Sequence, residues 1–199
     1  MNFFLVMILA VIVILAIIGF LVAVIYNRLV TLKNRFKNAF SQIDVQLRRR
    51  YDLIPQIVNA AKAYLQHESQ TLQNVIEARA RATSAQISLG GDPTQLAALE
   101  QLATADTQLS SAMGRLLVSM EAYPELKADQ SLSEVREEMA TTENRIAYAR
   151  QAYNDAVMYY NQEREKFPAV LFSELFGFGL AEQWHLDNQE AAAPPKVEF

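Results

Sequence analysis

The chain has 199 residues, a formal net charge of −4 and no cysteine. The lack of cysteine excludes disulfides, thiolate metal sites and a cysteine nucleophile, and so mild a charge gives no indication of nucleic-acid binding. Glycine and proline number only six each, which is typical of a helical chain.

The first element is an uninterrupted apolar run from Phe3 to Ile25. A helix of about 23 residues, at ~1.5 Å rise per residue, crosses a ~30 Å hydrocarbon core, and only a helix satisfies its own backbone there. The run is too long for a secretory signal peptide and lacks its basic start and small-residue cleavage site. It predicts an uncleaved transmembrane anchor over residues 1–27.

Basic residues follow the anchor before any acidic residue does. Because Lys and Arg favour the cytoplasmic side, the flanks predict a single-pass protein with its N-terminus outside and its body in the cytoplasm. Arg28, Lys33 and Arg35 are close enough to the apolar run to contact lipid headgroups as well.

Four amphipathic helices are predicted in residues 28–168 from apolar residues recurring at threes and fours. The first continues the anchor and is expected to end near Arg50, because Asp52 can cap a new helix and Pro55 is tolerated only in a first turn. The second helix is expected to end at the polar turn formed by residues 88–93.

Two start signals define the remaining helices. Asp92 as N-cap, with Pro93 at the first helical position, predicts the third helix, which ends near Tyr123. A capping box over residues 131–134 predicts the start of the fourth, and Phe167-Pro168 closes it. Short connections make neighbouring helices antiparallel, so the fold class is all-α: one transmembrane helix continuing into a long antiparallel four-helix bundle.

This alternation places the Gly90-Gly91 turn near the membrane and the three arginines Arg48, Arg49 and Arg50 far from it. Residues 169–181 form an apolar, amphipathic segment that returns to the membrane side. Residues 182–199, rich in Asn, Glu, Ala and Pro, are expected to be a disordered tail because they bury too little to become ordered.

Several linked motifs resemble the bacterial LemA family. They are YNRLV at residues 26–30, NAFSQIDVQLRRRYDLIPQIV at 38–58, ENRIAYARQAYNDAV at 143–157 and FPAVLFSELFGF at 167–178. Phe40 stands where the family has tryptophan. The resemblance implies a bacterial inner-membrane protein with one N-terminal span and a helical bundle. It implies no reaction, but a relative takes part in magnetosome organelles and members often lie near membrane-protease genes.

The arginine triplet has two interpretations. It could bind an acidic partner, or it could be a solvated helix end whose cations offset the helix dipole. The other polar residues of the motifs are expected to pair between helices and fix which helix faces which. The candidates for partner or inter-helix contacts are Arg48, Arg49, Arg50, Asp52, Glu143, Arg145, Arg150 and Asn154.

The segment around Phe172, Phe176 and Phe178 has two open uses. It could lie in the membrane interface as an amphipathic anchor, or it could fill a groove in the bundle or in a neighbour. We name these three aromatic residues as candidate lipid contacts.

No enzyme is predicted. The Glu-x-x-His pairs of di-iron bundles, the phosphate loop, the nucleophile elbow and the dinucleotide fingerprint are all absent from the sequence, so we assign no catalytic residue, cofactor or metal. The first hypothesis is a non-enzymatic scaffold that self-associates as a homo-oligomer and organises membrane lipids or membrane proteins. The alternative is an adaptor that presents a partner to a membrane protease or other inner-membrane machine.

Overall fold

The structure is a computed structural model that describes residues 2–62, 64–65 and 68–185. Over these residues it contains helices and no strand, so the predicted all-α fold with a long apolar N-terminal helix is confirmed. The elements are α1 (Asn2–Lys62), α2 (Ser69–Leu89), α3 (Leu96–Glu121), α4 (Pro124–Ala128), α5 (Gln130–Glu165) and α6 (Val170–Ser173).

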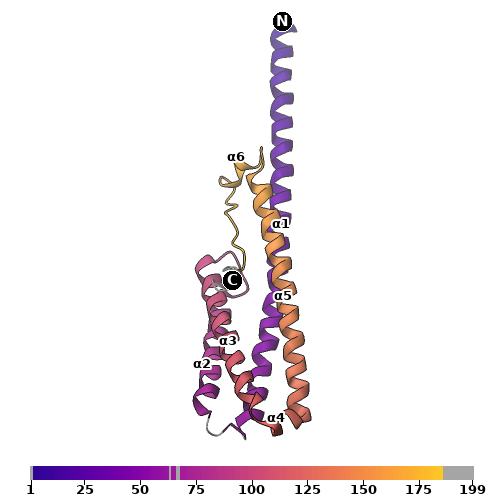
Figure 1. Ribbon diagram of the computed structural model, residues 1–199. Helices are drawn as coiled ribbons and strands as arrows, with labels where there is room; N and C mark the ends of the chain where they lie inside the picture. The colour runs from indigo at the N-terminus through magenta and orange to yellow at the C-terminus, as the bar shows by residue number, and fades with distance from the viewer. Residues whose placement is uncertain (1, 63, 66–67, 186–199) are drawn as a thin grey trace, which may run out of the picture.

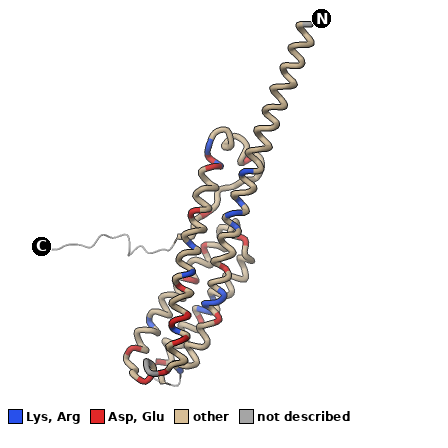
Figure 2. The backbone as a smooth tube through the Cα atoms, turned by 90° about the vertical axis from the view of Figure 1, so that its right-hand side faces the viewer, with Lys and Arg blue, Asp and Glu red and all other residues tan. Residues whose placement is uncertain are grey.

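The long helices form two antiparallel hairpins of unequal length. Figure 1 shows α5 running back along α1 almost to the level where α1 projects alone, whereas α2 and α3 lie beside only the lower part of that pair. The resulting body is an elongated bundle with the first part of α1 extending from one end. Figure 2 shows that this projecting part carries no charged residue, whereas charges are spread along the body.

α1 is one helix of 61 residues with two different surfaces. Its first part is apolar and exposed on all sides, and it is the one described helix that is long and apolar enough to cross a membrane, judged by length and composition. From Leu29 onward only one face is buried, at Leu29, Phe36, Phe40, Ile43 and Leu47. This change from all-round to one-sided apolar character is typical of a helix that leaves a membrane and enters a bundle.

The predicted end of the first helix near Arg50 is wrong. α1 continues to Lys62 with Pro55 inside it, and the buried stripe runs on through Ile54 and Ile57. An interior proline costs about 3 kcal/mol, but each buried isoleucine contributes roughly 1.5–3 kcal/mol. Tertiary packing therefore outweighs the local signal, and α2 begins only at Ser69.

The α2–α3 connection is a tight turn built on glycine. Gly90 and Gly91 have φ angles of 59° and 76°, a left-handed conformation that suits glycine because it has no Cβ. Asp92 does not cap α3 as predicted. Its carboxylate accepts hydrogen bonds from the backbone and side chain of Thr94 at 3.1 and 2.8 Å, and α3 begins later, at Leu96.

This turn lies beside the middle of α1. The Nζ atom of Lys37 lies 3.0 Å from the Asp92 carboxylate; although partial burial opposes it, hydrogen bonds from Lys37 and Thr94 lower the pKa of Asp92. Lys37 is about 16 Å along the helix from Tyr26. The predicted position of Gly90-Gly91 next to the membrane is therefore wrong, because α2 is shorter than expected.

The start of α5 differs from the predicted capping box by two residues. Asp129 is the N-cap, and its carboxylate accepts a hydrogen bond from the Leu132 backbone at 3.1 Å. Ser131 is exposed inside the first turn. The end of α5 agrees with prediction, since Glu165 is its last residue and Phe167-Pro168 follow.

Replacing the two residues separately should identify the cap. Asp129→Ala is expected to lower the free energy of unfolding by about 1 kcal/mol, because it removes the acceptor for an orphan amide, whereas Ser131→Ala should change it by less than about 0.5 kcal/mol. Denaturant unfolding in detergent followed by circular dichroism measures both. A larger loss for Ser131→Ala would restore the capping box.

Beyond α6 the chain turns back and runs along α5 in extended form. We call residues 178–185 the C-terminal strap; Figure 1 shows it descending from α6 toward the level of the α2–α3 turn. Phe178 and Trp184 are only 4% and 3% exposed. The prediction of disorder from residue 182 is therefore wrong for residues 182–185, and its remainder, residues 186–199, lies outside the described residues.

Candidate functional site: a buried ion cluster beneath a C-terminal strap

A cluster of charged side chains joins α1, α3 and α5 inside the body. Arg50 and Asp106 are each only 1% exposed, and their side chains meet at 2.8 Å. Arg150 binds the second carboxylate oxygen of Asp106, and Glu143 lies 3.2 Å from Arg50. Two arginines thus meet two carboxylates, and the cluster is electrically balanced.

The cluster is arranged to hold helices together. Both carboxylate oxygens of Asp106 are engaged by guanidinium groups, and the Tyr51 hydroxyl donates a further hydrogen bond to Asp106 at 3.4 Å. Burial, reinforced by the neighbouring Asp106 charge, raises the pKa of Tyr51. This pairing fixes which helix faces which, and it leaves neither oxygen of Asp106 free to act as a base. The Nε atoms of Arg50 and Arg150 are buried without a hydrogen-bond partner among the described residues.

A second polar arrangement attaches the strap to α5. Asn154 and Asn161 each make two hydrogen bonds to the backbone of one strap residue. The side-chain amide nitrogen donates to the carbonyl of that residue, and the side-chain amide oxygen accepts from its backbone N–H. Asn154 binds Trp184 in this way at 3.1 and 2.7 Å. Asn161 binds Ala181 at 2.8 and 3.1 Å.

Each asparagine is preceded on α5 by a tyrosine that also binds the strap backbone, by one hydrogen bond. The Tyr153 hydroxyl donates to the Glu182 carbonyl at 2.7 Å, and the Tyr160 hydroxyl donates to the Gly179 carbonyl at 2.8 Å. One turn further along, Arg164 donates to the Phe178 carbonyl at 2.7 Å. We call these five side chains, Tyr153, Asn154, Tyr160, Asn161 and Arg164, the α5 ladder.

Trp184 connects the ladder to the ion cluster. Its ring stacks on Phe40, with centroids 6.2 Å apart, and lies 4.9 Å from the Arg150 guanidinium, a cation–π distance. Its indole nitrogen is buried without a hydrogen-bond partner among the described residues. Trp184 therefore covers the arginine that holds Asp106.

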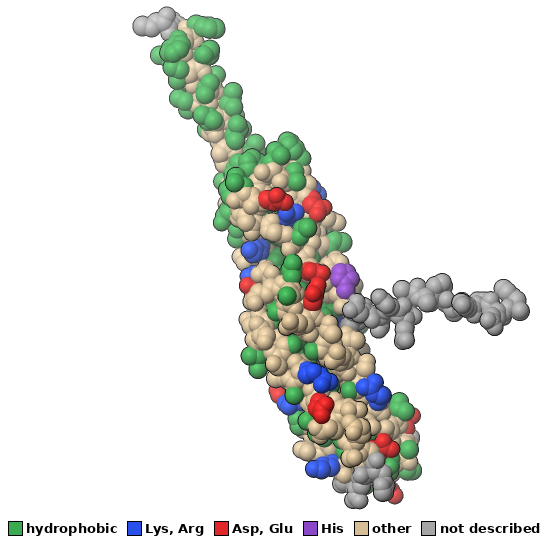
Figure 3. Space-filling model, turned by 90° about the vertical axis from the view of Figure 1, so that its left-hand side faces the viewer, with side chains coloured by type: hydrophobic (Ala, Val, Ile, Leu, Met, Phe, Trp, Pro, Cys, Tyr) green, Lys and Arg blue, Asp and Glu red, His purple; other side chains and the backbone are tan. Residues whose placement is uncertain are grey.

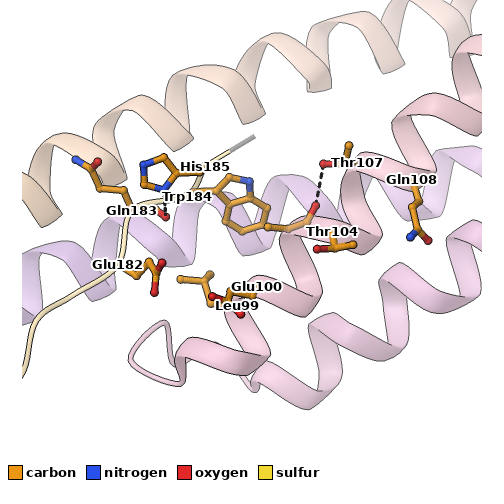
Figure 4. A pocket seen from close by; sticks show the side chains of 10 residues that line it. Leu99, Glu100, Thr104, Thr107, Gln108, Glu182, Gln183, Trp184 and His185 are labelled. Carbon is orange, nitrogen blue, oxygen red and sulfur yellow. Dashed lines mark hydrogen bonds between the residues drawn. The ribbon is translucent and has the colours of Figure 1, made fainter. Parts of the chain in front are cut away.

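An open cavity of about 450 Å³ lies between the strap and α3, lined by Leu99, Thr104 and Thr107 on one side and by Glu182, Gln183 and Trp184 on the other. Figure 4 shows Trp184 reaching across toward the two threonines of α3, with Glu182, Gln183 and His185 arranged along the strap. The strap is thus held firmly by α5 and only loosely by α3.

The buried tyrosines predict a loss of stability in alkali. Burial, with a smaller contribution from Glu182, raises the pKa of Tyr153, and burial likewise raises that of Tyr160. The folded state therefore keeps protons that the unfolded state releases above about pH 10. Their contribution to stability is complete below that pH and falls as the pH rises through the folded values.

We expect the free energy of unfolding to decline above pH 10 by up to about 1.4 kcal/mol per pH unit for each such tyrosine. Tyr153→Phe should reduce this decline by one such share. Chemical unfolding at a series of pH values measures it. An identical decline in the native protein and in Tyr153→Phe would contradict the assignment.

The apolar segment packs against the start of the body. The Tyr26 ring meets Phe176 and Phe178 edge-on at centroid distances of 5.5 and 5.4 Å, and the Lys33 amine lies 5.9 Å from the centre of the Phe178 ring. Lipid contact for Phe178 is therefore wrong, because this ring is buried in protein. Phe172 is half-buried and Phe176 is exposed, so their lipid contact stays a prediction.

The membrane-side end of the body nevertheless carries apolar surface. Phe167, Leu171 and Leu175 are largely exposed there, and Figure 3 shows hydrophobic side chains gathered where the body meets the projecting part of α1. Arg28 is exposed but pairs with Glu163 at 2.7 Å, and Arg35 is exposed. Lipid contact by Arg28, Lys33 and Arg35 stays a prediction.

The arginine triplet is not a helix end, because α1 continues for about three turns beyond it. Its members point in different directions: Arg50 enters the ion cluster, whereas Arg48 pairs with Asp44 at 2.9 Å and Arg49 with Glu138 at 2.6 Å. Of the other polar candidates, Glu143, Arg150 and Asn154 make the inter-element contacts described above. Asp52 and Arg145 are exposed.

Sequence reasoning missed Asp106 and most of the α5 ladder. The available signal for the ladder was the dipeptide Tyr-Asn at residues 153–154 and again at 160–161. Asp106 gave no local signal, because it is one acidic residue on an otherwise ordinary amphipathic helix. Within the described residues no group of three or more His, Cys, Asp or Glu is placed to hold a metal ion.

Known proteins resemble this chain over most of its length. The chain is similar to magnetosome proteins MamQ 1 and MamQ 2 of Paramagnetospirillum magneticum, each 26% identical over an alignment 195 residues long; each alignment covers 87% of this chain and 70% of the relative. It is also similar to magnetosome protein MamQ of Magnetospirillum gryphiswaldense, 23% identical over an alignment 175 residues long; the alignment covers 80% of this chain and 64% of the relative. Residues 39–199, which include the ion cluster and the strap, match the LemA family, and the chain therefore belongs to the LemA family.

Proposed function

We propose that this protein is a membrane-anchored helical scaffold without enzymatic activity, whose bundles self-associate in the cytoplasm at a bacterial inner membrane and organise lipids or other membrane proteins. The observation that carries the proposal is the continuity of α1, in which an exposed apolar segment passes without a break into the core of the bundle. A rigid connection of this kind fixes the height and direction of the body relative to the membrane.

Self-association is supported by exposed aromatic side chains on the outer face of α5. Tyr148 is 74% exposed and Tyr159 is 50% exposed; they lie about three turns apart on one side of the helix. Exposed tyrosines are common anchors of protein interfaces. A membrane span also confines all copies to two dimensions, which raises their effective concentration so that weak lateral contacts suffice.

The relatives named as magnetosome proteins favour a structural role in membranes over metabolism. The ion cluster is in keeping with this view, since both oxygens of the Asp106 carboxylate are held by arginines. Orientation rests on the basic residues after the span. A cysteine introduced at the exposed Ser88 should be protected from an impermeant thiol reagent in intact cells, and labelling there would reverse the topology.

The decisive measurement is the mass of the full-length protein in mild detergent by light scattering, with electron microscopy of the same sample. We expect a regular assembly that becomes smaller in the double variant Tyr148→Ser, Tyr159→Ser. Ile87→Ser is the matched control, because Ile87 is equally exposed but lies on α2. Monomers at high concentration would contradict the proposal.

An adaptor role is the second candidate, supported by an apolar cavity of about 360 Å³ near the membrane-distal end, lined by Ile57, Met113, Leu117 and Met139. Methionine-bearing surfaces adapt to varied partners, such as a membrane protease or another inner-membrane protein. Crosslinking in cells from a photoreactive residue at Gly114, beside this cavity, should then recover one distinct protein in a one-to-one complex. Recovery of self-crosslinks alone would exclude it.

A further inference from the structure

We propose that the α5 ladder is a peptide-binding site that accepts the C-terminal strap of a second copy, so that neighbouring copies are joined by exchanging straps. This inference rests on the proposed self-association and names the surface that carries it. The occupant is an extended segment with the features of residues 178–185, namely a free backbone edge, Phe178 at one end and Trp184 next to the other.

The ladder recognises an extended backbone by its spacing. Tyr153 and Tyr160, like Asn154 and Asn161, are seven residues apart, which is about 10.5 Å along a helix. The strap residues they bind, Glu182 with Gly179 and Trp184 with Ala181, are three apart, which is about 10 Å along an extended chain. The helix repeat and the strand repeat therefore match, and two identical binding units follow one another.

Most of this recognition does not depend on the strap belonging to the same chain. The ladder bonds reach backbone atoms of Phe178, Gly179, Ala181, Glu182 and Trp184. The side chains add two anchors: Phe178 against Tyr26, and Trp184 against Phe40 and Arg150. Every one of these contacts would be reproduced by the same segment from another copy, so exchange loses none of them.

The connection between α5 and the strap is suited to exchange. It contains only one four-residue helix, α6, and it reaches the strap through Gly177 at φ 71°, a position where glycine makes a change of direction inexpensive. About 12 residues lie between the end of α5 and the strap, and fully extended, with α6 unwound and Phe176 released from Tyr26, they span up to ~40 Å. That exceeds the ~20 Å across two packed helices.

A neighbouring copy is the occupant that the arrangement favours. The connection, which includes α6, lies at the membrane-side end of the body in Figure 1. The membrane anchors would therefore hold the connections of all copies at one height. On its outer side the strap faces the open cavity along α3, and Leu180 is exposed. The strap therefore can leave without separating α1 from α5.

The test uses two differently tagged full-length copies expressed together, one with Gln183→Cys on the strap and the other with Thr104→Cys on α3. These two residues line the same cavity, and the chain has no other cysteine. Membranes are treated with a short bis-maleimide, and the mass of the assembly is measured in parallel. We expect a crosslink between the two differently tagged copies.

Weakening the ladder in one copy at a time distinguishes an exchanged strap from two copies that merely lie close together. Asn154→Ala with Asn161→Ala in the Thr104→Cys copy should lower the inter-copy crosslink about tenfold or more, because that copy no longer receives a strap. The same pair in the Gln183→Cys copy should raise it, because its own strap is freed. Met158→Leu, on α5 but outside the ladder and exposed, is the control and should change neither yield.

Each result bears on one proposal or both. An inter-copy crosslink with the opposite responses of the two copies supports strap exchange. A further sample carries both Thr104→Cys and Gln183→Cys in the same copy. If this variant forms crosslinks only within single copies while the assembly has a high mass, strap exchange is overturned and the scaffold proposal stands. The same result in monomers would overturn both. Equal responses of the two copies would show proximity without exchange and overturn the inference.

Discussion

Replacing Asp106 by alanine is expected to destabilise the protein by about 3–5 kcal/mol. The Asp106 carboxylate is 1% exposed and is paired with both Arg50 and Arg150. Removing it leaves the buried Arg50 guanidinium with one charged partner among the described residues, the partly exposed Glu143, and a long 3.4 Å hydrogen bond to the backbone carbonyl of residue 106. Because arginine does not lose its charge in proteins, the variant must admit water or open the contact between α3 and the α1–α5 hairpin.

Thermal unfolding of the full-length protein in detergent measures this effect, and the shift in Tm should be roughly 10 °C for a chain of this size. Glu138→Ala is the matched control, since it removes the partner of Arg49 in an exposed pair at 2.6 Å. Exposed ion pairs contribute about 0–1 kcal/mol. Equal Tm values for Asp106→Ala and Glu138→Ala would show that the buried cluster does not hold the helices.

Replacing Trp184 by alanine is expected to release the strap while the helices stay folded. A buried tryptophan removes roughly 150–250 Å² from water, and its loss costs about 3 kcal/mol or more. Apart from Phe178, which packs against Tyr26 at the other end of the strap, the strap has few apolar contacts, because Leu180 is exposed. This cost is therefore borne by a local opening of the strap and not by global unfolding.

Hydrogen exchange at the Ala181 and Trp184 amides is the measurement, because Asn161 and Asn154 protect both in the docked strap. Protection in Trp184→Ala should fall by about 10²-fold, the equivalent of roughly 3 kcal/mol. His185→Ala, at the exposed neighbouring residue, should leave it unchanged. Retained protection in Trp184→Ala would show that the ladder alone holds the strap.

The two variants also test whether the strap and the ion cluster act together. Trp184 covers Arg150, which holds Asp106, so strap release admits water to the cluster. The effects of Trp184→Ala and Asp106→Ala should then be non-additive, as is found for residues that share a partner.

Local patterns in the sequence account for the membrane-spanning helix, the buried helix faces and two of the chain reversals. The apolar run after Phe3 predicts a membrane-spanning helix because its length as a helix matches the thickness of the hydrocarbon core and it contains no charged residue. The recurrence of apolar residues at threes and fours predicts the helices and their buried faces, such as Phe36 and Phe40. Glycine and proline mark the α2–α3 turn and the end of α5, because both residues restrict or permit specific backbone angles.

Tertiary packing, and not local pattern, sets where α1 ends, which acid the buried arginines meet and how residues 182–185 become ordered. Burial of Ile54 and Ile57 carries the helix through Pro55, against its local preference. Asp106 pairs with Arg50 and Arg150 across three helices that are distant in sequence. Trp184 becomes ordered because Phe40, Arg150 and Asn154 converge on it from α1 and α5. Each of these outcomes depends on free energy that arises only when separate segments pack together, so no pattern within one segment contains it.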